Sequence, residues 1–115
     1  MTGFKTLFKT DKVQRKSYRD RKKEYMLEQM ELCRSLDQNK CQSPFCQRKA
    51  IFSWTIDVHH ILGRGAAFLS VKFLVCLCRV CHTIVETDPG EMIRILEALE
   101  GRPNYRWQES LELLR

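Results

Sequence analysis

Four cysteines stand in two closely spaced pairs, Cys41-x4-Cys46 and Cys78-x2-Cys81. Two thiolates from one tight turn can meet two from another around a tetrahedral zinc ion, at about 2.3 Å each. Protein atoms would then fill all four positions, so such a site would hold the fold together and perform no hydrolysis. We therefore predict a structural zinc site at Cys41, Cys46, Cys78 and Cys81. The alternative is a set of buried thiols without a metal.

Three histidines form a second group with chemical potential: the adjacent His59 and His60, and His82 directly after the second cysteine pair. Neighbouring side chains on a strand point to opposite faces, so we expect His59 and His60 to take different roles. One would bind a metal with His82, and the other would face a water molecule as a general base. A metal with two or three protein ligands keeps open positions for Lewis-acid chemistry on a phosphoryl group. A histidine pair that ends a strand for no chemical reason is the alternative.

The segments around these residues have the composition of strands and a short helix. Residues 52–60 are rich in β-branched and aromatic side chains, which predicts a strand. A turn with Gly63 and Gly65 leads to a second predicted strand over residues 73–77, and a helix is expected over residues 79–86. Cys76 lies outside both cysteine pairs, so we interpret it as a core residue.

One long helix is predicted over residues 13–36, which hold no Gly or Pro and many good helix formers. Met26, Met30 and Cys33 recur at helical spacing. We expect this apolar stripe to pack on the domain, with Cys33 as a buried thiol.

The first half of this predicted helix is strongly basic. Residues 12–23 hold seven Lys or Arg and one acid, and the whole chain carries a formal charge of +6. A basic run of this density favours salt-dependent contacts with the phosphates of a polyanion such as DNA. A solvated helix face is the alternative. The predicted DNA-binding residues are Lys12, Arg15, Lys16, Arg19, Arg21, Lys22 and Lys23.

The last part of the chain predicts two further helices. Asp88 is a candidate N-cap, Pro89 suits the first helical position, and Glu91 is placed to close a capping box. Gly101 and Pro103 should end that helix, and a final helix should follow within residues 104–115.

The composition of the chain, 115 residues and 43% hydrophobic, fits one compact domain with extensions. We divide it into a basic helical extension over residues 1–40, a core over residues 41–86 and C-terminal helices over residues 87–115. The sequence shows neither an apolar stretch of about 20 residues nor a signal peptide. We therefore expect a cytoplasmic protein with no membrane partner. In a reducing compartment, six cysteines are better interpreted as metal ligands than as disulfides.

The order Cys-x4-Cys, VHHI, a glycine-rich turn and LVCLC-x2-CH resembles the HNH endonucleases with a zinc staple, members of the ββα-metal nucleases. The resemblance covers residues 41–86. It implies an α+β fold: a small ββα-metal core with a four-cysteine zinc knuckle, flanked by an N-terminal basic helix and C-terminal helices. It also implies a bacterial or phage protein acting in the cytoplasm of a bacterial host cell.

The resemblance also implies roles for individual residues. His59 corresponds to the first metal ligand, His60 to the general base that activates water, and His82 to the second metal ligand. Arg64, in the turn after the histidines, corresponds to a phosphate contact. Glu86 stands where some members have a further histidine, and a carboxylate there suits Mg²⁺ or Mn²⁺ as the catalytic ion. An exposed acid at the helix end is the alternative for Glu86.

One position departs from the family pattern. An asparagine that ties down the loop stands nine residues before the final histidine in the family, and this chain has Phe73 there. Ser70, a backbone group or packing alone would have to hold the loop instead. The expected function is a metal-dependent DNA endonuclease with little sequence preference. The competing hypothesis is a catalytically impaired, zinc-stabilised module that binds nucleic acid or protein, and a thiol redox protein using Cys78-x2-Cys81 is a weaker third.

Overall fold

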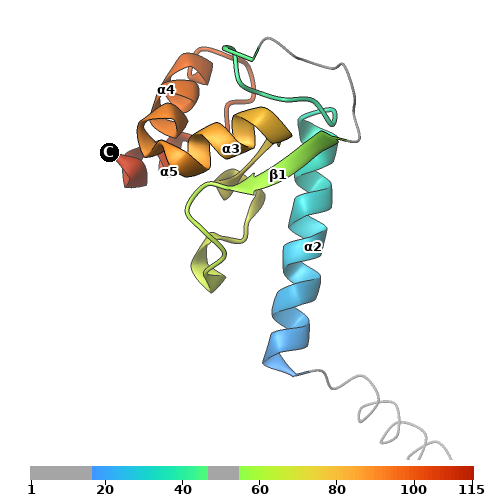
Figure 1. Ribbon diagram of the computed structural model, residues 1–115. Helices are drawn as coiled ribbons and strands as arrows, with labels where there is room; N and C mark the ends of the chain where they lie inside the picture. Colours follow the sequence, from blue (N-terminus) through green and yellow to red (C-terminus); the bar gives the residue numbers. More distant parts are fainter. Residues whose placement is uncertain (1–16, 47–54) are drawn as a thin grey trace, which may run out of the picture.

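The computed structural model describes residues 17–46 and 55–115. Within these residues the protein is a small α+β structure in which four α-helices surround one two-stranded antiparallel sheet (Figure 1). Two short 3-10 turns, Ala66–Phe68 and Val71–Phe73, lie between the strands. The main elements are α2 (Tyr18–Leu36), β1 (Ile56–His60), β2 (Leu74–Cys78), α3 (Arg79–Thr87), α4 (Pro89–Leu99) and α5 (Gln108–Leu114).

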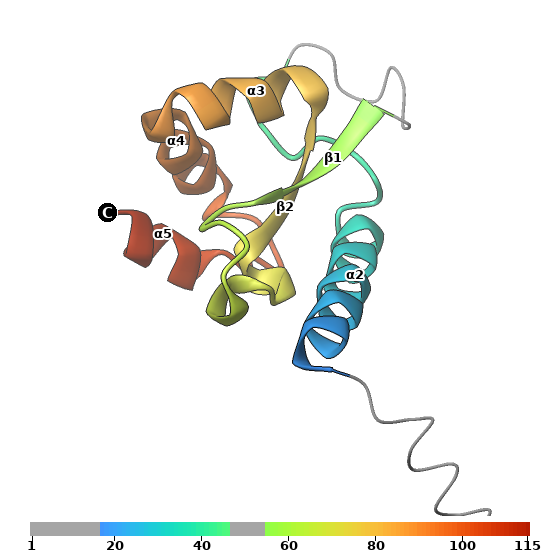
Figure 2. The ribbon, with the colours of Figure 1, turned by 60° about the horizontal axis from the view of Figure 1, so that its bottom comes forward.

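Helices cover both faces of the sheet. The α2 helix lies on one side of the sheet, and α3, α4 and α5 lie on the other (Figure 2). All five residues of β2 are therefore buried, whereas β1 alternates between buried and half-buried positions. Val58 is paired with Cys76, and His60 with Leu74. The Cys76 sulfur contacts Cys33 of α2, so Val58, and with it His60 two residues on, faces the α2 side.

The predicted strands are close to the observed ones. The first strand was expected over residues 52–60 and is found at Ile56–His60, with Thr55 in a helical turn and residues 52–54 outside the described part. The second was expected over residues 73–77 and is found one residue later. Cys78 ends β2 and also caps α3, because its sulfur accepts the backbone N–H of Cys81.

The helix expected over residues 13–36 begins only at Tyr18 in the structure. Ser17 has an extended backbone, and its side-chain oxygen accepts a hydrogen bond from the backbone N–H of Asp20 at 3.2 Å. A serine in this position is a strong helix start, which composition alone did not reveal. Residues 13–16 lie outside the described residues. The helix ends where Gln38 and Asn39 adopt positive φ angles of 55° and 51°.

Asp88 starts α4 as predicted, but the capping box is not formed. The Asp88 carboxylate accepts the backbone N–H of Gly90. Its own backbone N–H donates to Ile84 at the end of α3, so no donor remains for Glu91 to cap. Glu91 instead pairs with Arg94, at 3.2 Å.

A buried ion pair ties the last part of the chain to the rest. Arg106 donates to both carboxylate oxygens of Asp37, at 2.7 and 2.9 Å, and to the backbone oxygens of Val71 and Leu74. The Asp37 side chain is only 2% exposed. The Trp107 indole also donates to Leu74, at 2.7 Å. These bonds connect the end of α2, the start of β2 and the segment before α5.

Phe73 is held by packing and by backbone bonds. It is 3% exposed, and its ring meets Phe68 edge to face with centroids 5.3 Å apart. Its carbonyl accepts the backbone N–H of Ile61, and its own N–H donates to the carbonyl of Ser70. Backbone hydrogen bonds and packing therefore hold the loop at Phe73. Among the helices of the described ranges, none has both the length and the apolar character needed to cross a membrane.

Candidate metal centres

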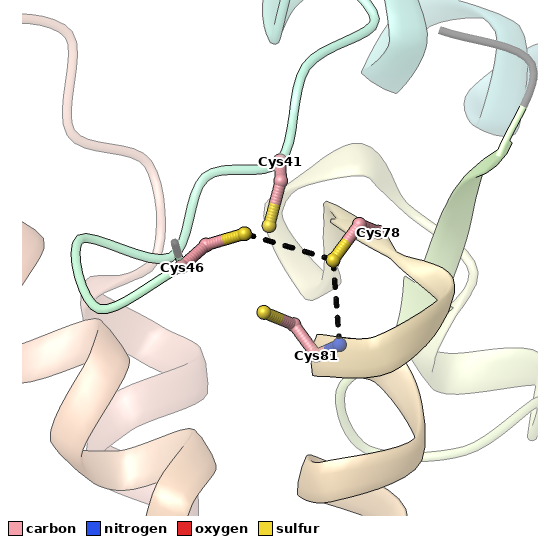
Figure 3. A group of neighbouring side chains, drawn as sticks. All are labelled: Cys41, Cys46, Cys78 and Cys81. Atoms are coloured by element: carbon pink, nitrogen blue, oxygen red, sulfur yellow. Dashed lines mark hydrogen bonds between the residues drawn. The ribbon is translucent and has the colours of Figure 1, made fainter. Parts of the chain in front are cut away.

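The four cysteines of the two sequence pairs converge on one point. Cys41 and Cys46 come from the loop after α2, Cys78 ends β2 and Cys81 lies in the first turn of α3 (Figure 3). Their sulfur atoms all lie within 4.8 Å of one another, and the Cys46 and Cys78 sulfurs are 3.7 Å apart. Four sulfurs placed about 2.3 Å from a tetrahedral zinc ion would be separated by about 3.8 Å. All six cysteines of the chain are described, and none forms a disulfide.

Ionisation of these thiols is uneven. Burial opposes ionisation of Cys78, but the backbone N–H of Cys81 and the neighbouring thiols hold its pKa below the usual range. Burial raises the pKa of Cys41 to about 11 and also raises the pKa of Cys81. One thiolate, that of Cys78, is thus favoured within the group, and a metal would have to displace protons from Cys41 and Cys81. The donor set and spacing fit zinc.

A second group joins the end of β1 to α3. His59 is half-buried, and its ring lies 4.9 Å from that of His82. Glu86, one helical turn after His82, places its Oε1 atom 3.0 Å from the His82 Nε2 atom. One donor atom from each of His59, His82 and Glu86 lies within 4.8 Å of the others. Burial, together with the nearby His82 and His60, lowers the pKa of His59 to about 4, so its ring is a neutral ligand at physiological pH.

Asp57 orients His82 and was not identified from the sequence. Its Oδ2 atom lies 3.0 Å from His82 Nδ1, and Arg79 binds both of its oxygens at 2.8 and 3.2 Å. Burial works against the charged carboxylate, but Arg79 and His82 hold the pKa of Asp57 below its usual range. The available signal was strand alternation, since Asp57 stands two residues before His59 and so shares its face. With Nδ1 held by Asp57, the Nε2 atom of His82 faces Glu86.

His60 lies in a different environment from His59. It is 8% exposed, and its Nε2 atom is buried with no hydrogen-bond partner among the described residues. Burial, with the positive charge of Arg64 and the nearby His82, lowers the pKa of His60. We expected the second histidine of the pair to face a water molecule, whereas the structure buries His60. On the α2 side of the sheet, the ring is shielded from solvent.

Most of the predicted phosphate contacts that lie in the described residues are exposed. Arg64 is exposed in the turn after Gly63, whose positive φ of 84° suits glycine. On α2, the side chains of Arg19, Arg21 and Lys23 are exposed, and Lys22 is half-buried. Lys12, Arg15 and Lys16 lie outside the described residues.

A third cluster contains Cys33, Asp37 and Cys76, which also bring their donor atoms within 4.8 Å of one another. Both cysteines are fully buried, as expected for core thiols, and their sulfurs are 3.8 Å apart. Arg106 already supplies the positive charge here, because its guanidinium binds both oxygens of Asp37 and the Cys33 sulfur. A hydrogen bond with Cys76 and burial raise the pKa of Cys33, so this thiol is a poor metal ligand. The cluster is a structural ion pair.

The described residues thus bring together the two predicted ligand groups, one of four cysteines and one of His59, His82 and Glu86. They separate His60 from the second group by turning it to the other face of β1. Comparison with protein-family models, with curated proteins and with solved structures gives no match.

Proposed function

We propose that this protein is a metal-dependent endonuclease that hydrolyses DNA phosphodiester bonds with low sequence specificity. The observation that carries the proposal is the group of His59, His82 and Glu86 at the junction of β1 and α3. Two antiparallel strands followed directly by a helix supply its ligands, in the order that the HNH resemblance implies. A cluster of two imidazoles and one carboxylate is more than packing of the sheet requires.

The residues of this group fit a divalent ion such as Mn²⁺ or Mg²⁺. Two ligands at right angles on an ion, each about 2.1 Å away, are separated by about 3 Å. The His82 Nε2 and Glu86 Oε1 atoms have that separation, 3.0 Å. Asp57 fixes His82 from behind, which is the usual arrangement for a histidine that binds a metal. The three side chains leave the remaining coordination positions to water and to phosphate oxygens.

The chain's own groups would divide the reaction between them. A bound divalent ion would supply Lewis-acid stabilisation of the charge that develops on the phosphoryl group. His60 would accept the proton of the attacking water through its Nε2 atom, which has no other partner among the described residues. As the water oxygen bonds to phosphorus, the bond to the 3′ oxygen would break, and the leaving oxygen would take a proton from solvent. Arg64 and the basic first half of α2 would contact phosphates without reading bases. The four-cysteine group would hold structural zinc and take no part in the reaction.

A second candidate function is a zinc-stabilised module that binds nucleic acid or protein without cutting. The observation that favours it is the burial of His60. A general base must be exposed before it can reach water. Phe73 also favours the binding module, because a buried phenyl ring cannot orient the loop through side-chain hydrogen bonds. For cutting, the end of β1 would therefore have to rearrange when DNA binds, so that the His60 ring becomes exposed and faces the group of His59, His82 and Glu86.

The test is a nicking assay on supercoiled plasmid with zinc-loaded protein in Mg²⁺, in Mn²⁺ and in EDTA. Wild-type protein should cut only with the added divalent ion. His60→Ala and Glu86→Gln should lose cutting, whereas Glu97→Gln, an exposed acid on α4, serves as the matched control. Zinc content should be the same in all four proteins, and each should unfold cooperatively above the assay temperature.

Failure to cut by folded, zinc-loaded wild type on duplex, nicked, branched and single-stranded DNA would move the assignment to the binding module. Phe73→Asn would then be assayed for gain of cutting. Equal cutting by wild type and His60→Ala would remove His60 from the reaction.

DNA binding by α2 is tested separately. The double variant Arg19→Gln with Lys23→Gln should reduce the slope of log affinity for DNA against log salt concentration by about 2. An unchanged slope would exclude α2 from the DNA interface.

A further inference from the structure

An apolar stripe runs along the exposed side of α2. Its four residues follow one another at intervals of seven, seven and four, which places them within about 40° of one another around the helix. They are between 42% and 66% exposed. Cys33, the one buried residue of α2, lies roughly a quarter of a turn away. The stripe consists of Tyr18, Tyr25, Leu32 and Leu36.

The charges of α2 are divided along its length. Residues 18–23 hold four basic residues and one acid, and residues 24–33 hold three acids and no base. Arg21 and Glu28 lie beside the stripe, four residues before and three residues after Tyr25. Two such helices side by side would repel if parallel, whereas in the antiparallel arrangement each basic half would face an acidic half.

We propose that α2 pairs antiparallel with the α2 helix of a second copy of this chain, around a two-fold axis at Tyr25. Tyr18 then lies opposite the partner's Leu32, because both stand seven residues from the axis. Arg21 comes within one residue, about 1.5 Å along the axis, of the level of the partner's Glu28. The same surface serves both copies, as a two-fold dimer requires.

The shape of the molecule leaves this surface accessible. In both views the first half of α2 extends past the sheet and past α3, α4 and α5 (Figures 1 and 2). A second copy of the chain is favoured over other binding partners for this surface. In the antiparallel arrangement the basic half of each α2 helix faces the acidic half of the other. The helix is 19 residues long, so the contact is smaller than a standard stable interface. We therefore expect a reversible dimer.

Sedimentation equilibrium without DNA tests the proposal. Wild-type protein should pass from monomer to dimer between about 1 µM and about 1 mM, the range expected for an interface below standard size. Tyr25→Lys should weaken the dimer at least about tenfold, because it places two ammonium groups at the axis. Leu27→Lys is the matched control: Leu27 is 50% exposed on the opposite side of the same helix. Its dimer constant should be that of wild type.

A charge exchange tests the antiparallel direction. Arg21→Glu and Glu28→Arg should each weaken the dimer, and the two substitutions together should restore it. In a parallel pair each residue would face its own copy, so the double variant would bring no recovery. The proposal is overturned if wild-type protein stays monomeric over the whole range, if Leu27→Lys weakens the dimer as much as Tyr25→Lys, or if the double variant shows no recovery. These readouts do not depend on nuclease activity.

Discussion

Removal of zinc from the four-cysteine group should destabilise the whole domain. The Cys46 and Cys78 sulfurs are 3.7 Å apart but 32 residues distant in the chain. Cross-linking a loop of that length removes chain entropy from the unfolded state worth about 4 kcal/mol. A domain of this size has a total stability of about 5–15 kcal/mol, so the loop term alone is a large share of it. Zinc-depleted protein should therefore melt roughly 10–20 °C lower than zinc-loaded protein.

The assay pairs metal analysis with thermal unfolding followed by circular dichroism. Wild-type protein should contain one zinc per chain that resists EDTA better than the ion of the second group does. Cys46→Ala should lose the zinc, whereas Cys76→Ala removes a buried sulfur outside the group and should keep it. The reasoning fails if depleted wild type melts at the same temperature as loaded protein, or if Cys76→Ala loses zinc while Cys46→Ala retains it.

Three other perturbations follow from the contacts of buried groups. The pKa of His59 is lowered to about 4, so its neutral form stabilises the fold above the unfolded pKa near 6.5, and this contribution is lost as the pH falls. Between about pH 7.5 and about pH 5.5, urea unfolding should show wild type losing about 1 kcal/mol more than His59→Gln. Arg106→Met leaves the Asp37 carboxylate buried without its partner and should cost about 3–5 kcal/mol in urea unfolding, part of which Asp37→Asn should recover in the double variant. Asp57→Asn should weaken Mn²⁺ binding near His82 about 10- to 100-fold by calorimetry, with zinc content unchanged.

Each of these has an outcome that contradicts it. Equal pH dependence in wild type and His59→Gln would mean that the folded protein does not depress the pKa of His59. A cost below about 1 kcal/mol for Arg106→Met would show that water reaches Asp37. Unchanged Mn²⁺ affinity in Asp57→Asn, with His82→Ala as the positive control for loss, would place the ion elsewhere.

The sequence contained most of the information for the two ligand groups. The two cysteine pairs, with two and four residues between their members, can be recognised from short stretches of sequence. Each pair can form a tight turn whatever the rest of the fold. Strand alternation separated His59 from His60, and it could also have identified Asp57 on the face of His59. The helix from Asp88 was readable because its cap and proline are adjacent in the chain.

Other features depend on contacts that no local pattern contains. Arg106 and Asp37 are 69 residues apart, and neither stands in a recognisable motif. The burial of His60 depends on which face of β1 packs toward α2, and the pairing of β1 with β2 sets that face. The capping box at Glu91 did not form because the backbone N–H of Asp88, which the box needs, donates instead to the carbonyl of Ile84 in α3. In each case the observed contact depends on a residue far away in the sequence or on a competing hydrogen-bond acceptor.

The carbonyl of Leu74 accepts hydrogen bonds from both Arg106 and Trp107, which has a consequence for synthesis on the ribosome. The four cysteines of the candidate zinc site all leave the ribosome before either donor does. Until Arg106 emerges, Asp37 lacks the cation that pairs with it in the folded protein. Burial of the unpaired carboxylate is unfavourable, and this opposes packing of α2 against the sheet. We expect a nascent chain held at the point where Cys81 has left the ribosome and Arg106 has not to bind zinc yet leave α2 open to protease. Closure of the core would then follow the appearance of residues 106 and 107.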